Sequence, residues 1–501
     1  MFAALLVIIA TTIVTWLYIR WRKVKNFWAE RNVPHDPPHP IYGSLTFLQK
    51  KNVAIWLREV YTKFKTPYIG IWLFRRPGLI VNSPELARKI LVKDADNFRN
   101  RFLSSGQSDP IGALNIFTVN DPIWTAVRKR LTSVFTAAKL RSLQSLTKQK
   151  VKDLIFRIGE EMKDIREDFN LRALFSDFST DVIGEAAFGL KSEATRTGDS
   201  VLRKVTRDFM QFSVFRGLCW SSIFFYPELV DVFRFSFFPK DTVEFLKQIF
   251  RTVIAQRGGL DAAPKEQRDL LDALLKMRHE AKLENEDMSE DMLLAQATIF
   301  LQAGFDTSGA ALAWLIYELA HDSEVQEKLY RELMDAKQQL GTDDFDSTHL
   351  SEMVYLNAVI KEALRKYPAM GWLDRISAQE YKLDDKLTIP AGTVIYVNAY
   401  GMHMDPDNFP EPDTYDPERF MPENEKNIKP YTYMPFGEGP RNCIGMRFSQ
   451  QSIRFAVAAI SMKFTLQPLP NKPKPNECQM ERKGLFLMPD EKMPIRFIPR
   501  N

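Results

Sequence analysis

FGEGPRNCIGMRF (residues 436–448) holds one of the three cysteines in a chain of 501 residues. It fits the pattern F-x-x-G-x-R-x-C-x-G, with Phe436, Gly439, Arg441, Cys443 and Gly445 at the fixed positions. Glycines let a backbone turn and approach a neighbour closely. Residues from 444 onward predict a helix, whose first amides and dipole favour a thiolate over a thiol. The stretch therefore predicts a thiolate ligand held against a large flat group.

Composition is that of a folded protein, with 45% hydrophobic and 26% charged residues. The 68 basic and 63 acidic residues leave a net charge of +5, which does not indicate a nucleic-acid partner. Length alone favours two or more domains. Cys219, Cys443 and Cys478 form no CxxC pair and are too few for a disulfide framework. We therefore expect the body of the protein in a reducing compartment.

FAALLVIIATTIVTWLYI (residues 2–19) is an uncharged run that as a helix would be about 27 Å long, close to the bilayer core. The basic segment RWRKVK (20–25) follows it, which is the reverse of the order in a cleaved signal peptide. The positive-inside rule then leaves the rest of the chain on the cytoplasmic side. We expect a transmembrane signal anchor over 1–20, a basic and Pro-rich linker over 21–45 and a catalytic domain over 46–501.

Further motifs lie in order along the chain: WTAVRKR (124–130), AGFDTS (303–308), EALR (362–365), Arg375 in YPAMGWLDR, and PERF (417–420). Together with the cysteine loop they resemble the haem-thiolate monooxygenases, the cytochrome P-450 family, over nearly the full chain. The resemblance is closest to insect-type microsomal members that oxidise plant toxins and insecticides. It implies the cytochrome P-450 fold: a mainly α-helical haem domain with small β-sheets, one domain instead of the two that length favours.

The resemblance implies haem b as the cofactor and Cys443 as its axial thiolate ligand. Residues expected against the haem and its propionates are Phe436, Gly437, Arg441, Trp124, Arg128 and Arg375. Asp306 and Thr307 match the acid–alcohol pair that organises proton delivery, and Gly304 is expected to leave room for dioxygen. The i, i+3 spacing puts Glu362 and Arg365 on one helix face, and with Arg419 they match a structural triad.

Family-equivalent segments predict a pocket for flat or aromatic lipophilic substrates. Its expected residues are Phe102, Phe117, Phe212, Phe215, Ala303, Phe305, Trp372, Leu373, Leu485 and Phe486. The aromatic-rich region 209–250 fits either ordinary core packing or a flap that touches the membrane and admits substrate. Two positions depart from the family pattern. Ala369 stands where a second proline is usual, beside the pocket, and Ser449 replaces a glycine at a position expected outside the haem contacts.

The implied reaction inserts one oxygen atom of dioxygen into lipophilic substrates, here plant toxins or insecticides, on the cytoplasmic face of the endoplasmic reticulum membrane. Electrons are expected from a separate NADPH–cytochrome P-450 reductase, with cytochrome b5 as a second donor. Lys129, Arg130 and Arg447 form either a docking patch for that reductase or ordinary solvated charge.

Three alternatives remain open at this stage. One is an endogenous hydroxylase of hormones or fatty acids. A reductase-independent, peroxide-rearranging haem enzyme is disfavoured by the Asp306–Thr307 pair. A non-catalytic haem sensor or carrier would need neither that pair nor an aromatic access region.

Overall fold

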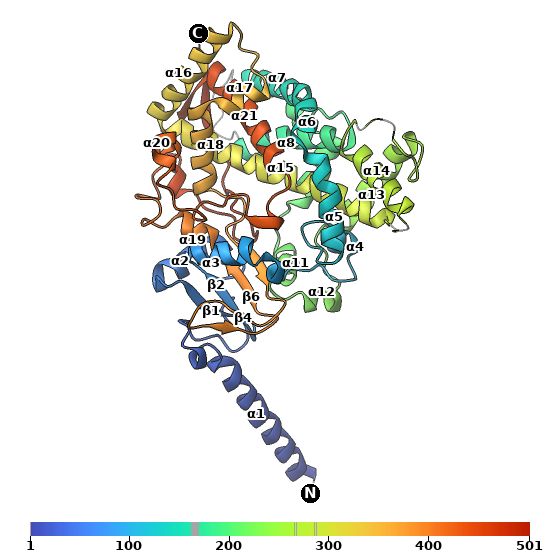
Figure 1. Ribbon diagram of the computed structural model, residues 1–501, viewed down its shortest axis with the longest axis vertical. Coiled ribbons are helices and arrows are strands. Elements are labelled where there is room, and N and C mark those ends of the chain that lie inside the picture. Colours follow the sequence, from blue (N-terminus) through green and yellow to red (C-terminus); the bar gives the residue numbers. More distant parts are fainter. Residues whose placement is uncertain are drawn as a thin grey trace.

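The computed structural model describes residues 2–161, 170–264, 266, 268–284, 286 and 288–500. Its first helix, α1 (Phe2–Asn26), stands clear of the body, with the N-terminus at the far end (Figure 1). The apolar side chains of α1 are exposed, and within Ala4–Arg31 a window of 18 residues has a mean hydropathy of 1.8. An apolar helix of this length whose apolar window is not buried by the body is a candidate membrane anchor, as predicted.

The largest sheet lies at the end of the body from which α1 extends (Figure 1). Its four strands have the order β1-β2-β6-β3, with bounds β1 Tyr68–Leu73, β2 Arg76–Val81, β6 Val394–Val397 and β3 Leu373–Ile376. Pairing is antiparallel except between β2 and β6. In the register of β3 and β6, Arg375 lies opposite Ile395, both in the protein interior. Two smaller sheets pair β4 (Tyr381–Lys382) with β5 (Thr388–Ile389) and β7 (Phe464–Pro468) with β8 (Ile495–Pro499).

The longest helix, α15 (Glu290–His321), passes through the middle of the body and is mostly buried (Figure 1). Its first turn is capped by Ser289, whose Oγ accepts a hydrogen bond from the Met292 amide at 3.1 Å. Gly309 allows close packing on α8 (Leu171–Phe188), because a Cβ there would lie 3.1 Å from the backbone of Ser176. The crossing of α15 and α8 therefore forms a rigid wall for the central cavity.

Other helices surround α15. The longer ones are α2 Val53–Phe64, α5 Ile123–Thr132, α7 Gln144–Glu161, α10 Val201–Phe209, α11 Val214–Phe225, α13 Lys240–Gln256, α14 Leu270–Leu283, α16 Ser323–Leu340, α18 Val354–Lys366 and α21 Met446–Lys463. The shorter ones are α3 Pro84–Arg88, α4 Pro110–Leu114, α6 Ala137–Ser142, α9 Ala194–Thr197, α12 Glu228–Phe233, α17 Ser347–Glu352, α19 Ala399–His403 and α20 Pro422–Glu425. One large apolar cluster extends from Leu45 to Phe497. The mainly helical architecture with small sheets confirms the predicted fold.

The aromatic-rich region 209–250 divides its side chains between core and surface. Phe224 and Phe237 are buried in the core. Val214, Phe215 and Phe233 are each about 60% exposed, at 62%, 62% and 60%. The exposed ones belong to α11 and α12, which lie at the same end of the body as β1 and β2 (Figure 1). Core packing is thus confirmed for the buried residues, and the flap that touches the membrane stays a prediction for the exposed ones.

Candidate active site

A cavity of about 270 Å³ lies between α15 and the loop that precedes α21. Its lining joins segments that are far apart in the sequence, and it includes both Ala369 and the cysteine of the 436–448 loop. The predicted haem and proton residues that line it are Trp124, Arg128, Asp306, Thr307, Phe436, Gly437, Arg441 and Cys443. The fold thus brings eight predicted site residues to one cavity.

The cysteine loop is a tight turn whose backbone needs its glycines. Gly437 and Gly439 have φ values of 72° and 74°, in the left-handed region that other residues adopt only with strain. A Cβ on Gly439 would also collide with the carbonyl oxygen of Leu91. The Cys443 amide donates to the Phe436 carbonyl at 2.8 Å, which closes the turn. In this turn the Cys443 side chain is exposed to the cavity.

Two opposing effects act on the Cys443 thiol. Burial raises its pKa, since the charged thiolate loses hydration. The backbone amide of Gly445, the Arg128 and Arg101 guanidiniums and the Met446 amide act in the other direction. These groups stabilise negative charge on the sulfur, but by themselves they do not lower the pKa of the thiol below its ordinary value. A cation bound to the sulfur would complete the deprotonation, so the donor set fits the iron of a haem.

Three arginines lie close together with little to neutralise them: Arg101 and Arg441, which line the cavity, and Arg375, which is near both but does not line it. Arg101 and Arg441 each have buried Nε and Nη1 atoms that find no hydrogen-bond partner in the described part of the chain. Burial, together with the charge of the neighbouring Arg101, lowers the pKa of Arg441 to about 8 and that of Arg375 to about 9. Asp374 is the acid that opposes all three shifts. Such an excess of buried positive charge calls for an anion.

The cluster fits the two propionates of a haem. Its unpartnered donors are charged N–H groups suited to carboxylates, and the cavity that they border ends at the cysteine. Arg441 also lies over the Trp124 ring, 4.2 Å from its centroid, which fixes the guanidinium at the cavity edge. The residues present therefore fit the haem that the resemblance implies.

Arg128 and Arg101 differ from what the sequence predicts. Arg128 lines the cavity, but its two Nη atoms donate to Asn442, to the carbonyl at 2.9 Å and to Oδ1 at 2.8 Å. It therefore holds the cysteine loop. Arg101, which the sequence does not predict as a site residue, is the third member of the cluster with Arg375 and Arg441. It lies in the motif-free segment NFRNRF (97–102), and only the fold brings it to the other arginines.

The opposite wall carries the acid and the alcohol. Asp306 is 3% exposed, and burial raises its pKa to about 6 against the opposing charges of Arg172 and Arg203. Its Oδ1 lies 3.8 Å from Arg172 Nη2, and its Oδ2 is buried with no hydrogen-bond partner among the residues that the structure describes. The Thr307 hydroxyl donates to the Ala303 carbonyl at 2.6 Å. This pair can hold and pass a proton near neutral pH.

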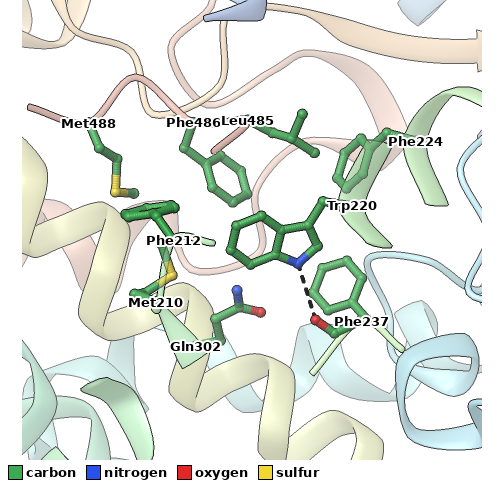
Figure 2. Close-up of a pocket in the computed structure, with 9 residues that line it drawn as sticks. All are labelled: Met210, Phe212, Trp220, Phe224, Phe237, Gln302, Leu485, Phe486 and Met488. Atoms are coloured by element: carbon green, nitrogen blue, oxygen red, sulfur yellow. Dashed lines mark hydrogen bonds between the residues drawn. The ribbon is translucent and has the colours of Figure 1, made fainter. Parts of the chain in front are cut away.

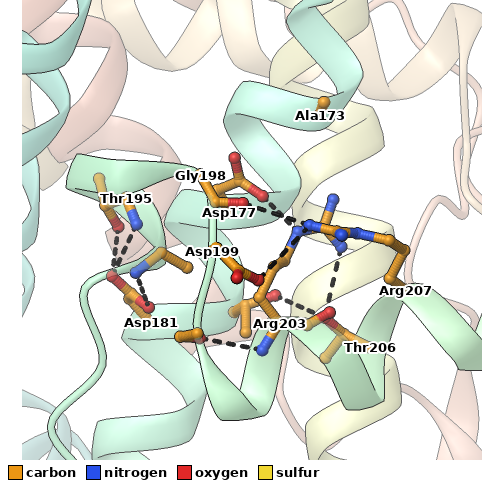
Figure 3. A network of polar contacts seen from close by, with 12 residues as sticks. Ala173, Asp177, Asp181, Thr195, Gly198, Asp199, Arg203, Thr206 and Arg207 are labelled. Carbon is orange, nitrogen blue, oxygen red and sulfur yellow. Dashed lines mark hydrogen bonds and ion pairs between the residues drawn. The ribbon is translucent and has the colours of Figure 1, made fainter.

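Arg203 also belongs to a buried polar network behind α15 (Figure 3). It bonds Asp177 of α8, which also accepts from Arg157 at 2.7 Å. Asp181, one turn further along α8, accepts from the amide and the hydroxyl of Thr195 at 2.8 Å each. The network joins α7, α8, α9 and α10, so it holds the helices around Asp306 in place.

The predicted Glu–Arg–Arg arrangement is present beneath the cysteine side. Glu362 and Arg365 are fully buried and form two hydrogen bonds of 2.7 Å. Arg419 Nε lies 3.5 Å from Glu362 Oε1. Arg365 also donates to the carbonyls of His403 and Pro412 at 2.8 Å each. The triad thereby ties α18 to the segments that precede the cysteine loop.

A second, much smaller cavity of about 10 Å³ adjoins the first (Figure 2). We call it the aromatic chamber, and its lining is Met210, Phe212, Trp220, Phe224, Phe237, Gln302, Leu485, Phe486 and Met488. Phe237, Gln302 and Phe486 line both cavities. The Trp220 indole donates to the Phe237 carbonyl at 3.2 Å.

The predicted substrate residues divide into two groups. Those that line the larger cavity or the aromatic chamber are Phe117, Phe212, Ala303, Leu373, Leu485 and Phe486. The structure places the other four outside both, which corrects the predicted pocket. Phe102, Phe305 and Trp372 are buried in the core, and Phe215 is exposed on α11.

One smaller expectation also needs correction. Ser449 was expected outside the haem contacts, but it lines the larger cavity and lies at hydrogen-bond distance, 3.0 Å, from Ser308 of α15. Gly304, which is expected to leave room for dioxygen, lines the larger cavity. A Cβ there would meet the Ile183 side chain of α8 at 2.5 Å, so this glycine also permits close helix packing.

The chain is similar to proteins of one known family. The family model described as "Cytochrome P450" matches residues 33–497. "Cytochrome P450 6k1" of Blattella germanica is 30% identical, over 98% of this chain and 96% of the relative. "Cytochrome P450 6l1" of the same species is 32% identical, over 94% and 92%. "Probable cytochrome P450 6g2" of Drosophila melanogaster is 30% identical, over 96% of each.

Proposed function

The chain belongs to the cytochrome P-450 family, and from that membership we propose that it is a membrane-anchored monooxygenase that oxidises lipophilic plant toxins or insecticides. Membership itself implies an oxygenase with a cysteine-ligated haem. The similarity to insect relatives fits a detoxification role. The finer assignments, haem b, the partner proteins and the substrates, are part of the proposal.

One observation carries the proposal. The thiol of Cys443 and the carboxyl of Asp306 line the same 270 Å³ cavity, whose edge holds arginines with unpartnered donors. Cys443 would ligate the iron, while Arg101, Arg375 and Arg441 would bind the propionates. When bound, the haem supplies the activation of dioxygen and the oxidation chemistry.

The remaining steps belong to the chain's own residues. Burial holds the pKa of Asp306 at about 6, so near neutral pH its carboxyl can both accept and release a proton. The Thr307 hydroxyl lies in the same cavity and can exchange its bond to the Ala303 carbonyl for one to a bound water or ligand. The apolar rings Phe117 and Phe486 exclude water and hold the substrate. Amides at the start of α21 support negative charge on Cys443.

Electrons must come from a partner, for which we propose NADPH–cytochrome P-450 reductase, with cytochrome b5 as a second donor. Lys129 and Arg447 are exposed on the side of the cysteine loop. Arg130 instead forms ion pairs with Glu284 and Glu286 at 2.6 and 2.8 Å. The docking surface that we propose therefore rests on Lys129 and Arg447. α1 would anchor the enzyme in the endoplasmic reticulum membrane, with the body on the cytoplasmic side.

The deciding experiment is the carbon monoxide difference spectrum of the reduced protein, beside Cys443→Ser. We expect the red-shifted Soret band of thiolate-ligated haem in the wild type and its loss in the variant. NADPH-dependent product formation with added reductase then follows on a panel of plant toxins, insecticides, steroids and fatty acids. Absence of that band from well-folded, haem-loaded protein would overturn the proposal.

A further inference from the structure

Gln302 of α15 is a buried polar residue whose side-chain oxygen has no partner. Its side chain is 6% exposed, and Oε1 makes no hydrogen bond within the described part of the chain. An unpartnered buried acceptor loses its hydration without compensation. Most such groups in folded proteins are satisfied. Gln302 therefore calls for a ligand group that is absent from the chain itself.

Gln296, on the same helix, shows how a structural glutamine is arranged here. Its Oε1 accepts from the Ile116 amide at 2.8 Å, and its Nε2 donates to the Leu114 carbonyl at 2.7 Å. Both ends of that amide are used to fix the loop after α4. Gln302 has the same side chain and is also buried, but its Oε1 holds no backbone amide in the described part of the chain.

Among the described residues, the surroundings of Gln302 supply no donor for its oxygen. Its amide head points into the aromatic chamber, between aromatic side chains (Figure 2). The nearest obvious donor, the Trp220 indole, is already bonded to the Phe237 carbonyl. The chamber volume of about 10 Å³ is at the lower limit for a single water. Other side chains that line the chamber are apolar.

Gln302 can nevertheless be reached from the larger cavity, because it lines both. We propose that Gln302 determines substrate specificity: its Oε1 accepts a hydrogen bond from a hydroxyl or N–H group of an otherwise apolar substrate, at the end that enters the aromatic chamber. Met210 and Met488 in the chamber wall have flexible, adaptable side chains, so the chamber can widen around that end. The inference rests on the proposed monooxygenase function and adds the class of substrate to it.

The test uses haem-loaded, full-length protein and three biphenyls: the nearly isosteric 4-hydroxybiphenyl and 4-methylbiphenyl, and the larger 4-methoxybiphenyl. Affinities come from equilibrium dialysis, which depends on neither turnover nor the haem spectrum. We compare the ratio of the methyl to the hydroxyl dissociation constant in the wild type and in Gln302→Leu. We expect the ratio to fall about tenfold in the variant, since a single buried hydrogen bond is lost. The wild type should also prefer the hydroxyl to the methoxy ligand, which accepts but cannot donate.

Gln302→Met repeats the measurement in case leucine disturbs packing, and an unchanged carbon monoxide spectrum verifies the fold of both variants. Gln296→Leu is the matched control, expected to lower stability and leave the ratio unchanged. A ratio that stays within twofold of the wild type in both Gln302 variants would overturn the inference. An altered pH profile of turnover with an unchanged affinity ratio would also overturn the inference. Gln302 would then act on Asp306, which lies four residues further along the helix. Absence of the thiolate band would instead contradict the proposed function, and the dialysis ratio would remain measurable.

Discussion

Asp306 Oδ1 lies 3.8 Å from Arg172 Nη2, and this buried acid lines the same cavity as Cys443. Arg172 is held in turn by the Pro489 carbonyl at 3.3 Å and the Phe212 ring at 5.3 Å. The guanidinium thus joins the acid to the C-terminal loop and to the wall of the aromatic chamber. Burial raises the pKa of Asp306, and Arg172 limits the rise.

Replacing Arg172 with methionine should raise the pKa of Asp306 above its value of about 6, because the main opposing charge is lost. We expect the pH dependence of turnover with saturating reductase to move by about one unit to higher pH. Arg172→Lys keeps the charge and should restore the wild-type profile. If Arg172→Met and the wild type share one profile, Arg172 does not control this acid.

Asp306→Asn should stabilise the folded chain at neutral pH while it lowers turnover. The pKa of Asp306 is raised in the folded state from 3.8 to about 6, so the folded protein retains a proton that the unfolded chain has lost. Its stability therefore falls as pH rises from about 4 to 6. Removing the buried charge should increase the free energy of unfolding at pH 7.5 by up to about 3 kcal/mol. Denaturant unfolding at pH 4 and pH 7.5 measures this, and an equal effect at both would contradict it.

Arg101→Leu should act in opposite directions on the haem-free and haem-loaded protein. Without haem, Arg101 is a buried charge with unpartnered nitrogen atoms, so its removal should stabilise the chain by about 1–3 kcal/mol. With haem, a propionate partner is lost, and we expect about tenfold faster haem transfer to an acceptor protein. Unfolding of both forms and the rate of haem transfer measure the two effects. Destabilisation of the haem-free chain would show that Arg101 is structural.

Local motifs made the cysteine loop and the Glu362–Arg365 pair predictable, because each depends on residues within a few positions of one another. Arg101 and Gln302 belong to no motif. Their significance arises from what surrounds them in the fold: two other arginines for Arg101, and a chamber without donors for Gln302. Neither environment can be seen in a single sequence.

The substrate residues show a different limit. A segment can be assigned to the pocket from its position in the chain, but the direction of each side chain depends on tertiary packing. On α15, Ala303 lines the cavity, whereas Phe305 lies in the core. On α11, Phe224 faces the chamber and Phe215 faces outward. Helical periodicity alone does not say which face of α11 is inside when both faces are apolar.

Glu362→Ala should destabilise the protein by about 3–5 kcal/mol, because it leaves buried Arg365 without its carboxylate. The adjacent surface pair of Lys361 and Glu425 is the matched control. Lys361→Ala removes an exposed ion pair and should cost less than about 1 kcal/mol. Thermal unfolding of the haem-loaded proteins checks both values. Similar losses in the two variants would mean that the triad contributes no more than a surface pair.

The last prediction concerns the membrane and the exposed apolar residues of α11 and α12. Phe215 and Phe233 are 62% and 60% exposed at the end of the body from which α1 extends (Figure 1), and exposed apolar patches of this kind mark interaction surfaces. We expect full-length protein in phospholipid vesicles to show slowed hydrogen exchange over 214–233, compared with protein in detergent. Phe215→Ser with Phe233→Ser should abolish that protection and raise the KM for membrane-dissolved substrates severalfold. Leu283→Ser, which changes a 73% exposed side chain on α14, is the control and should leave both unchanged. Equal hydrogen exchange over 214–233 in vesicles and in detergent would show that α11 and α12 do not contact the membrane. α1 would then be the proposed membrane contact.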